Sequence, residues 1–290
     1  MSPLHMFLLF DIGGTSTRIG ISHDGATLAQ HEKVDTPRDF DELLAMLKAA
    51  AERLGNGERV EAAAGGIACP MRKDRSTLLW APNLPNAWVG KVFPNALSDV
   101  LGGAPVYLEN DVGIVGLGEL RHGAGKGSDV MVYATISTGI NSARFVHGVL
   151  ADPGMFGYET GHQYIDIDKT LCGRCGRGTA IEYCSGADME KHYGKKPYEV
   201  RDARVWEEKA RFAAYMLHNT IVHWSPDTIV LGGAMITGEP SISVERIEHH
   251  LREIMYIFPE IPTLTEATLE SIGGLYGALE FAKQKHGAGQ

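Results

Sequence analysis

The chain has 290 residues, of which 44% are hydrophobic and 22% charged, as expected for a globular protein with one large domain or two ordinary ones. The formal net charge of −9 and the lack of a dense lysine or arginine cluster argue against nucleic acid or a membrane as a partner. The apolar run of residues 6–10 ends at Asp11 and is too short for a signal sequence or a membrane span, so we expect a cytoplasmic protein.

Residues 5–34 predict a strand, a glycine turn and two more strands, at 16–22 and 27–34. The turn is Asp11-Ile12-Gly13-Gly14-Thr15. Adjacent glycines let backbone N–H groups approach a phosphate without an intervening Cβ, and Asp11 could hold a metal-bound water. The alternative is a plain glycine turn, because a Gly-Gly pair alone is a weak indication.

A helix is predicted from Thr36, as its N-cap, to Gly55, with Pro37 as its first residue. A buried strand over residues 60–69 follows. The next loop, residues 80–88, contains two tryptophans and two asparagines, one of them Asn83. These residue types suit a sugar, which offers hydroxyls at its edge and C–H groups on its faces. The alternative is a surface loop whose tryptophans fill the core.

Two carboxylates and an amide stand between a predicted strand at 104–108 and a predicted helix at 112–120. They are Glu109, Asn110 and Asp111. They lie at the carboxyl end of a strand, which is the edge where open α/β sheets bind ligands. A carboxylate there can take a proton from a hydroxyl that Asn110 holds. The alternative is that Asp111 serves only as the N-cap of the helix.

The second half of the chain repeats the pattern of strand, small-residue turn and strand. After a flexible crossover at 121–127, residues 130–136 and 140–146 predict a hairpin with Ser137, Thr138 and Gly139 at its turn. Another tight turn, Gly232-Gly233, follows an apolar strand. The other predicted elements are helices at 182–190, 203–223, 241–256 and 275–285 and strands at 228–231 and 263–269.

Five motifs in this order resemble the ROK family of sugar kinases over roughly residues 5–282. They are Asp11 to Thr15, Leu108 to Asp111 with Leu117 to Glu119, Thr138 to Ile140, Glu159 to His162 with the following Cys-Gly pair and Glu182, and Ile229 to Gly233. The resemblance implies an α/β, two-lobed actin-like ATPase (ribonuclease H-like) fold with an interlobe cleft. We expect residues 1–120 plus 276–290 in a smaller N-terminal lobe and residues 121–275 in a larger C-terminal lobe.

The resemblance also implies ATP-dependent phosphorylation of a hexose or N-acetylhexosamine, with Asp111 as the general base. The residues that would bind the sugar are Asn83, Asn110, Asp111, Glu159, His162 and Glu182. The residues that would line the nucleotide and its phosphates are Asp11, Gly13, Gly14, Thr15, Thr138, Gly139, Gly232 and Gly233. Mg²⁺ would bridge the phosphate oxygens of ATP. A sugar and a nucleotide are the expected partners, in a homodimer.

The zinc segment of the family is altered most in this chain. His162, Cys172 and Cys175 match three ligands, but Ala180 stands where the family has its third cysteine. Cys184 lies one helical turn after Ala180 and could replace the missing ligand. We therefore expect Zn²⁺ on His162, Cys172, Cys175 and Cys184. The alternative is that Cys184 is a buried core residue.

The second phosphate motif departs from the family as well. Ser137, Asn141, Ser142 and Ala143 stand where the family usually has glycines, and their side chains narrow the space over the phosphates. Three other functions stay open: a non-catalytic sugar sensor, a kinase that uses polyphosphate, and an actin-like ATPase with a protein client. Asp111 argues against a sensor, which needs no base, and the sugar segment at 159–182 argues against a protein client.

Overall fold

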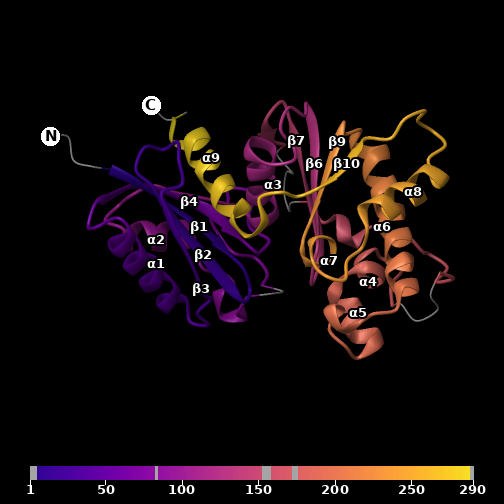
Figure 1. Ribbon diagram of the computed structural model, residues 1–290. Helices are drawn as coiled ribbons and strands as arrows, with labels where there is room; N and C mark the ends of the chain where they lie inside the picture. The colour runs from indigo at the N-terminus through magenta and orange to yellow at the C-terminus, as the bar shows by residue number, and fades with distance from the viewer. Residues whose placement is uncertain (1–4, 82–83, 152–157, 172–175, 288–290) are drawn as a thin grey trace. The chain divides into compact units, whose positions relative to one another are not determined.

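The computed structural model describes residues 5–81, 84–151, 158–171 and 176–287 (Figure 1). The chain forms two compact units. The first unit runs to Gly123 and resumes at Leu269, and the second comprises Ala124–Ala151 and Tyr158–Thr268. The sequence placed these junctions at 120–121 and 275–276. The return to the first unit thus comes before the last helix, α9 (Gly273–Gly287), which belongs to this unit from its first residue.

The first unit contains a five-stranded sheet in the order β3-β2-β1-β4-β5. Its strands are β1 (His5–Ile12), β2 (Ser16–Ser22), β3 (Gln30–Asp35), β4 (Arg59–Ile67) and β5 (Val106–Asn110). The β1 strand pairs antiparallel with β2 and parallel with β4, which pairs parallel with β5. Leu8, Leu9 and Phe10 of β1 are all fully buried. This continuous apolar run is what a central strand covered on both faces requires.

Helices cover both faces of this sheet (Figure 1). On one face, α1 (Phe40–Leu54) and α2 (Phe93–Val100) pack in one buried cluster with Phe10 and with Trp88 of the short helix η1 (Asn86–Trp88). On the other face lie α3 (Asp111–His122) and α9, which the turn η4 (Glu270–Ile272) precedes. Every helix within the described residues is too short or too polar to cross a bilayer.

Glycines bring α3 and α9 into close contact. A Cβ at Gly277 would overlap the carbonyl oxygen of Ile114, and a Cβ at Gly118 would overlap the carbonyl oxygen of Gly273. The two helices can therefore pack backbone against backbone. This packing fixes α3, whose first residue is Asp111, against the sheet.

The N-terminus of α1 differs from the prediction. The helix begins at Phe40, and its N-cap is Asp39, whose side chain accepts hydrogen bonds from two backbone N–H groups. Thr36 has another role, because its hydroxyl donates to the carbonyl of Gly13 at 2.7 Å and lies 2.9 Å from the hydroxyl of Thr17. Thr36 thus secures the first glycine turn. The predicted end of the helix at Gly55 is confirmed.

The second unit contains a five-stranded sheet in the order β10-β9-β6-β7-β8. Its strands are β6 (Val130–Ile136), β7 (Ile140–Val146), β8 (Val149–Leu150), β9 (Thr228–Gly232) and β10 (Thr263–Glu266). The first strand of this unit pairs antiparallel with the second and parallel with the fourth, as in the first unit. The two sheets therefore share one topology, and the turns at 13–15 and 137–139 occupy equivalent positions in it.

The helices of the second unit are α4 (Ile181–Cys184), α5 (Gly186–Tyr193), α6 (Ala203–Trp224), α7 (Ala234–Thr237) and α8 (Val244–Ile254), with short η2 (Thr160–His162) and η3 (Pro197–Glu199). The single helix predicted at 182–190 is wrong, because Ser185 is extended and separates α4 from α5. The side chain of Ser185 caps α5 by accepting from the backbone N–H of Asp188. The predicted edge strand is confirmed as β10.

Candidate active site

The strand-to-helix junction of the first unit carries the predicted catalytic segment. Asn110 is the N-cap of α3, and its side-chain oxygen accepts from the backbone N–H of Val112 at 3.1 Å. Asp111 is the first residue of the helix and is half-buried. The alternative in which Asp111 is the N-cap is therefore wrong. Asp111 is therefore available for a role other than capping the helix.

The Glu109 carboxylate before this junction is tied to Arg75. Nε of Arg75 lies 2.9 Å from both oxygens of Glu109, which is 8% exposed. One of these oxygens also accepts from the backbone N–H of Asn110 at 2.8 Å. Arg75 has a φ of 58° in the turn that the bridge between Met71 and Leu78 closes. Sequence reasoning missed this pair, since the partners are 34 residues apart.

Asp11 is the second-to-last residue of β1 and lies at the same sheet edge. It is in register with Gly66 of β4, and a Cβ at Gly66 would come within 2.9 Å of the Asp111 Cα. Burial raises the pKa of the Asp11 carboxyl, and Arg18, whose guanidinium lies 3.6 Å away, partly offsets the rise. Among the described residues the Asp11 carboxylate, which is 9% exposed, has this one long ion pair, so it suits a further positive charge nearby.

The glycine turn after Asp11 is fixed by hydrogen bonds to Ser16 and Thr36, and its last residue is exposed to solvent. The backbone N–H of Gly13 donates to Ser16 at 3.1 Å, and Thr36 binds the carbonyl of Gly13. Gly13 and Gly14 are half-buried, and Thr15 is exposed. The described site residues predicted in the first unit thus lie at one end of its sheet. They are Asp11, Gly13, Gly14, Thr15, Asn110 and Asp111. Asn83 lies outside the described residues.

The second unit carries two tight turns at one edge of its sheet. The turn at Thr138 and Gly139 is tied to the start of α5, because Ala187 N–H donates to the Thr138 carbonyl at 3.1 Å. Gly232 is in register with Thr135 of β6, so the 232–233 turn lies at the same sheet edge. Gly233 has a φ of 90°, and a Cβ there would come within 2.6 Å of the Thr135 hydroxyl. Glycine is therefore required at 233 by both backbone conformation and space.

The predicted sugar residues of this unit lie in the η2 and α4 segments. The Ser142 hydroxyl donates to the Thr160 hydroxyl at 2.8 Å, and both residues are buried. Ser142, one of the departures from the family motif, thus positions η2, which ends at His162, and Glu159, which precedes it. Desolvation raises the pKa of Glu159, and His162 partly offsets this rise.

Glu182 is held by the loop that precedes it. One carboxylate oxygen accepts from the backbone N–H groups of Arg177 and Gly178 at 2.6 and 3.1 Å, and from the Thr179 hydroxyl at 3.2 Å. Although desolvation alone would raise it, these hydrogen bonds hold the pKa of Glu182 below its ordinary value. Glu182 is therefore an ionised acceptor at neutral pH. It lines a pocket of about 210 Å³ with Gly176, Ile181, Ser185, Ala187, Asp188, Lys191 and His192.

The Cys184 thiol does not fit a zinc ligand. It is fully buried among core residues, and it donates to the Ala180 carbonyl at 3.3 Å. Burial raises the pKa of the thiol to about 12, whereas a zinc ligand is a thiolate. Cys172 and Cys175 lie outside the described residues.

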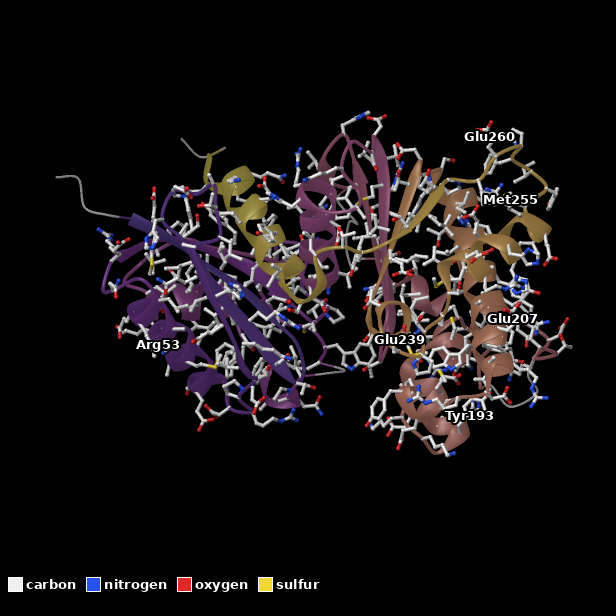
Figure 2. All side chains as sticks on the ribbon, viewed as in Figure 1. Arg53, Tyr193, Glu207, Glu239, Met255 and Glu260 are labelled. Carbon is white, nitrogen blue, oxygen red and sulfur yellow. The ribbon has the colours of Figure 1, made fainter. Side chains whose placement is uncertain are left out.

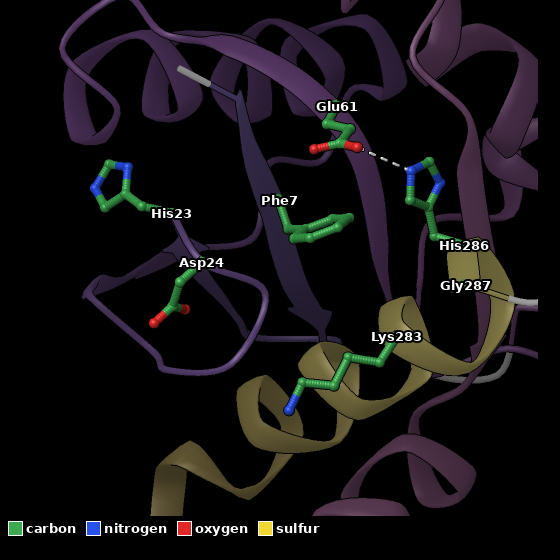
Figure 3. Close-up of a pocket in the computed structure, with 7 residues that line it drawn as sticks. All are labelled: Phe7, His23, Asp24, Glu61, Lys283, His286 and Gly287. Atoms are coloured by element: carbon green, nitrogen blue, oxygen red, sulfur yellow. Dashed lines mark hydrogen bonds and ion pairs between the residues drawn. The ribbon is translucent and has the colours of Figure 1, made fainter. Parts of the chain in front are cut away.

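A second pocket, of about 390 Å³, lies near the other end of β1 (Figure 3). Phe7, four residues before Asp11, is one of the residues that line it. The other lining residues are His23, Asp24, Glu61, Lys283, His286 and Gly287. Its Glu61 and His286 already pair with each other at 3.2 Å. None of the predicted site residues lines this pocket.

The sequence matches the ROK family over residues 8–285. The chain belongs to the ROK family. It is 27% identical over 302 residues to an N-acetyl-D-glucosamine kinase from Escherichia coli, an alignment that covers 94% of this chain and 98% of that protein. Residues 8–285 include every described position to which the family resemblance gave a role.

Solved structures agree with this assignment. A ROK hexokinase from Thermus thermophilus is 26% identical, with a TM-score of 0.81 over 98% of this chain and 99% of that chain. A ROK glucokinase from Streptomyces griseus in complex with glucose and AMPPNP is 24% identical, with a TM-score of 0.76 over 96% of this chain and 99% of that chain. The predicted actin-like ATPase fold is confirmed.

Proposed function

We propose that this ROK-family sugar kinase transfers the γ-phosphoryl group of ATP to a hydroxyl of a hexose or an N-acetylhexosamine, with Asp111 as the general base. The observation that carries the proposal is the division of roles at the start of α3. Asn110 caps the helix, and Asp111 follows it at the sheet edge that also carries Asp11. An aspartate is ionised at neutral pH and can take the hydroxyl proton as the oxygen attacks phosphorus.

The sugar would be oriented by hydrogen-bond acceptors and donors. Asn110 uses its side-chain oxygen as the cap, and its amide N–H groups can donate to a sugar hydroxyl. Glu182, which the loop keeps ionised, would accept from another hydroxyl. The full set is Asn83, Asn110, Asp111, Glu159, His162 and Glu182. Phosphoryl transfer needs little more than positioning and charge neutralisation, so this set has mainly to hold the hydroxyl in line.

The phosphates would lie along the two glycine turns. Gly13, Gly14, Thr15, Thr138 and Gly139 would donate backbone and hydroxyl hydrogen bonds to the phosphates, and Gly232 and Gly233 would border the nucleotide. AMPPNP in the Streptomyces griseus neighbour supports ATP as the donor. Mg²⁺, when bound, neutralises phosphate charge, and the poorly compensated carboxylate of Asp11 fits the role of holding one of its waters.

The test is a coupled ADP-release assay over glucose, mannose, fructose, allose and the N-acetylhexosamines. We expect turnover with at least one of them and with ATP as donor. Polyphosphate in place of ATP distinguishes the two donor classes. Sugar binding by calorimetry without turnover by either donor would instead support the sensor function.

A further inference from the structure

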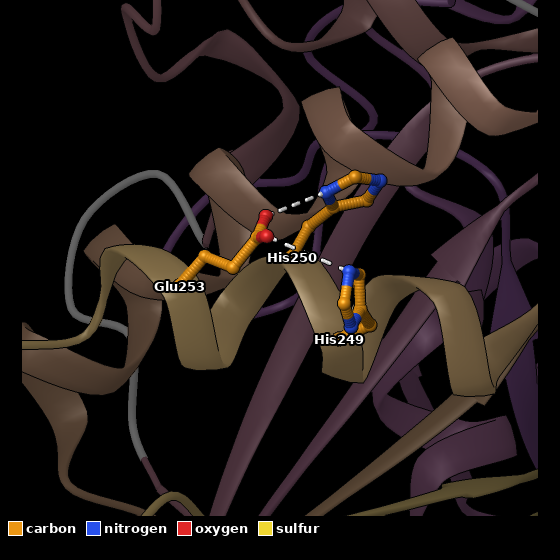
Figure 4. Close-up of side chains that lie close together, drawn as sticks. All are labelled: His249, His250 and Glu253. Carbon is orange, nitrogen blue, oxygen red and sulfur yellow. Dashed lines mark hydrogen bonds and ion pairs between the residues drawn. The ribbon is translucent and has the colours of Figure 1, made fainter.

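Helix α8 carries a group of metal-ligating side chains that the proposed reaction does not use. His249, His250 and Glu253 each offer one ligand atom, and these atoms all lie within 4.8 Å of one another. Nε2 of His249 lies 3.5 Å from one oxygen of Glu253, and Nδ1 of His250 lies 3.2 Å from the other. Both rings turn toward this carboxylate (Figure 4). It is the one such group among the residues that the structure describes.

The helical spacing explains why the three side chains converge. Glu253 is four residues after His249 and three after His250, and both separations place side chains on one face of a helix. Adjacent residues differ by about 100° around a helix, so the two rings approach the carboxylate from either side. The convergence is thus built into regular helix geometry.

The other ring nitrogen of His250 has a partner on α6. Nε2 lies 2.8 Å from a carboxylate oxygen of Glu207, a residue labelled on α6 in Figure 2. Arg246 holds that carboxylate with Nε at 2.9 Å and a terminal nitrogen at 2.5 Å. The Glu207 carboxylate, paired with the Arg246 guanidinium, is thus placed to accept a hydrogen bond from Nε2–H of His250.

This arrangement directs the lone pair of His250 toward Glu253. A neutral imidazole carries one N–H, and with that proton on Nε2 for Glu207 the Nδ1 atom is left as an acceptor facing a carboxylate. Two acceptors that face each other are satisfied by a cation between them, either a proton on Nδ1 or a metal ion. Histidines that ligate metals commonly donate their other N–H to a carboxylate, which is the role that Glu207 can fill.

We propose that His249, His250 and Glu253 bind a divalent transition-metal ion of the zinc class, with Glu207 orienting His250 from outside the ligand set. Two imidazoles and one carboxylate form a nitrogen and oxygen set that suits Zn²⁺ better than Mg²⁺ or Ca²⁺. The side chains of His249 and Glu253 are 52% and 58% exposed. Solvent therefore supplies the remaining ligands, and the ion exchanges readily. This site is distinct from the cysteine segment.

The test is a Zn²⁺ titration by calorimetry of the full chain, purified without a histidine tag and stripped of metal. A Cys172→Ser/Cys175→Ser background removes the cysteine segment. We expect one Zn²⁺ per chain in this background, lost in His249→Gln/His250→Gln. Glu207→Gln should raise the dissociation constant for Zn²⁺ about tenfold to a hundredfold, the usual effect of removing an outer carboxylate. His223→Gln, an exposed histidine on α6, is the matched control and should leave binding unchanged.

Co²⁺ gives a second, independent measurement. Bound Co²⁺ should show d–d absorption without a thiolate charge-transfer band, because the proposed ligands hold no sulfur. Should the double variant fold poorly by circular dichroism, Glu253→Gln replaces it, since that side chain is exposed. The proposal is overturned if the background protein and the folded variants take up the same number of Zn²⁺ ions with the same affinity.

Discussion

Gly66 of β4 lies directly against Asp111: a Cβ built at Gly66 would come within 2.9 Å of the Asp111 Cα and within 3.2 Å of the Ile114 side chain. Gly66 is also in register with Asp11 on β1. A residue without a side chain therefore lets the start of α3 settle on the sheet beside the strand end that carries Asp11. The proposed base and the proposed phosphate-side acid owe their proximity to this contact.

Gly66→Ala should move the start of α3, and with it Asp111, away from Asp11. The added methyl group meets backbone, which cannot rotate away, so we expect a loss of about 1–3 kcal/mol in the free energy of unfolding, as for other overpacked sites. The kcat of the kinase should fall as well, because α3 carries Asp111. Denaturant unfolding and steady-state kinetics measure both. Gly273→Ala is the control, since a Cβ there meets its nearest neighbours at 3.4 and 3.5 Å, which is ordinary contact. Equal effects of the two substitutions would contradict this role of Gly66.

Asp111→Asn tests the base itself. The amide keeps the size of the side chain, and Asn110 still caps the helix, so we expect sugar affinity to stay within a few-fold by calorimetry. The kcat should fall at least about a hundredfold, the usual scale for a lost general base. Asp99→Asn, an exposed acid on α2, is the control. If Asp111→Asn keeps both sugar binding and turnover, a group other than Asp111 accepts the proton of the sugar hydroxyl.

Local patterns predicted the strands and glycine turns of both units well. The antiparallel strands that follow residues 11–15 and 137–139 are the clearest cases, because alternation and turn residues act within a few positions. The start of α1 was wrong for a different reason. Thr36 is a good N-cap by residue type, but its hydroxyl is engaged by Gly13, which is 23 residues away in sequence. A tertiary partner outweighed a local preference.

The candidate site shows the same limit. The motif order indicated Asp11, Asn110 and Asp111, whereas Arg75 carried no sequence pattern that points to Glu109. The close approach of Gly66 to Asp111 also depends on how α3 packs on β4, which no spacing within either segment specifies. Likewise, Ser185 reads as a helix residue by composition, and the break there appears only because its side chain caps α5.

The Arg75–Glu109 pair should position the sugar-binding segment. Arg75→Met leaves the Glu109 carboxylate, whose side chain is 10% exposed, without its cation, and we expect a stability loss on the order of 3 kcal/mol. Because Glu109 also accepts from Asn110 N–H, KM for the sugar should rise more than kcat falls. Adding Glu109→Gln should restore most of the lost stability, since no unpaired charge then remains buried. Strictly additive losses in this double-mutant cycle would mean that the two side chains act independently.

Asp166 should make the stability of the second unit depend on pH. Its carboxylate accepts from Tyr183 and from the backbone N–H groups of Thr170 and Leu171 at 2.9 and 3.0 Å. Burial alone would raise the pKa, but these hydrogen bonds hold the pKa of Asp166 below its ordinary 3.8. Between the folded and unfolded pKa values the unfolded chain binds more protons, so this stabilisation is present above 3.8 and lost as the pH falls through the folded value.

Asp166→Asn should therefore lower the denaturation midpoint at neutral pH, with a gap from the wild type that narrows below pH 3.8. Denaturant unfolding across this pH range measures the effect. Asp168→Asn changes an exposed neighbour and should leave the midpoint unchanged throughout. A gap for Asp166→Asn that stays constant with pH would show that the ionised form is not what stabilises the loop.

Cys184→Ala distinguishes the two roles of this cysteine. The thiol is fully buried and bonded to Ala180, so we expect unchanged zinc content and a stability loss of about 1 kcal/mol from the vacated volume. Zinc should be counted in a His249→Gln/His250→Gln background, so that an ion on α8 does not contribute. Cys172→Ser in the same background tests whether the cysteine segment holds zinc at all. Loss of one zinc in Cys184→Ala would require the thiol to leave the core and α4 to unwind, and would restore Cys184 as the fourth ligand.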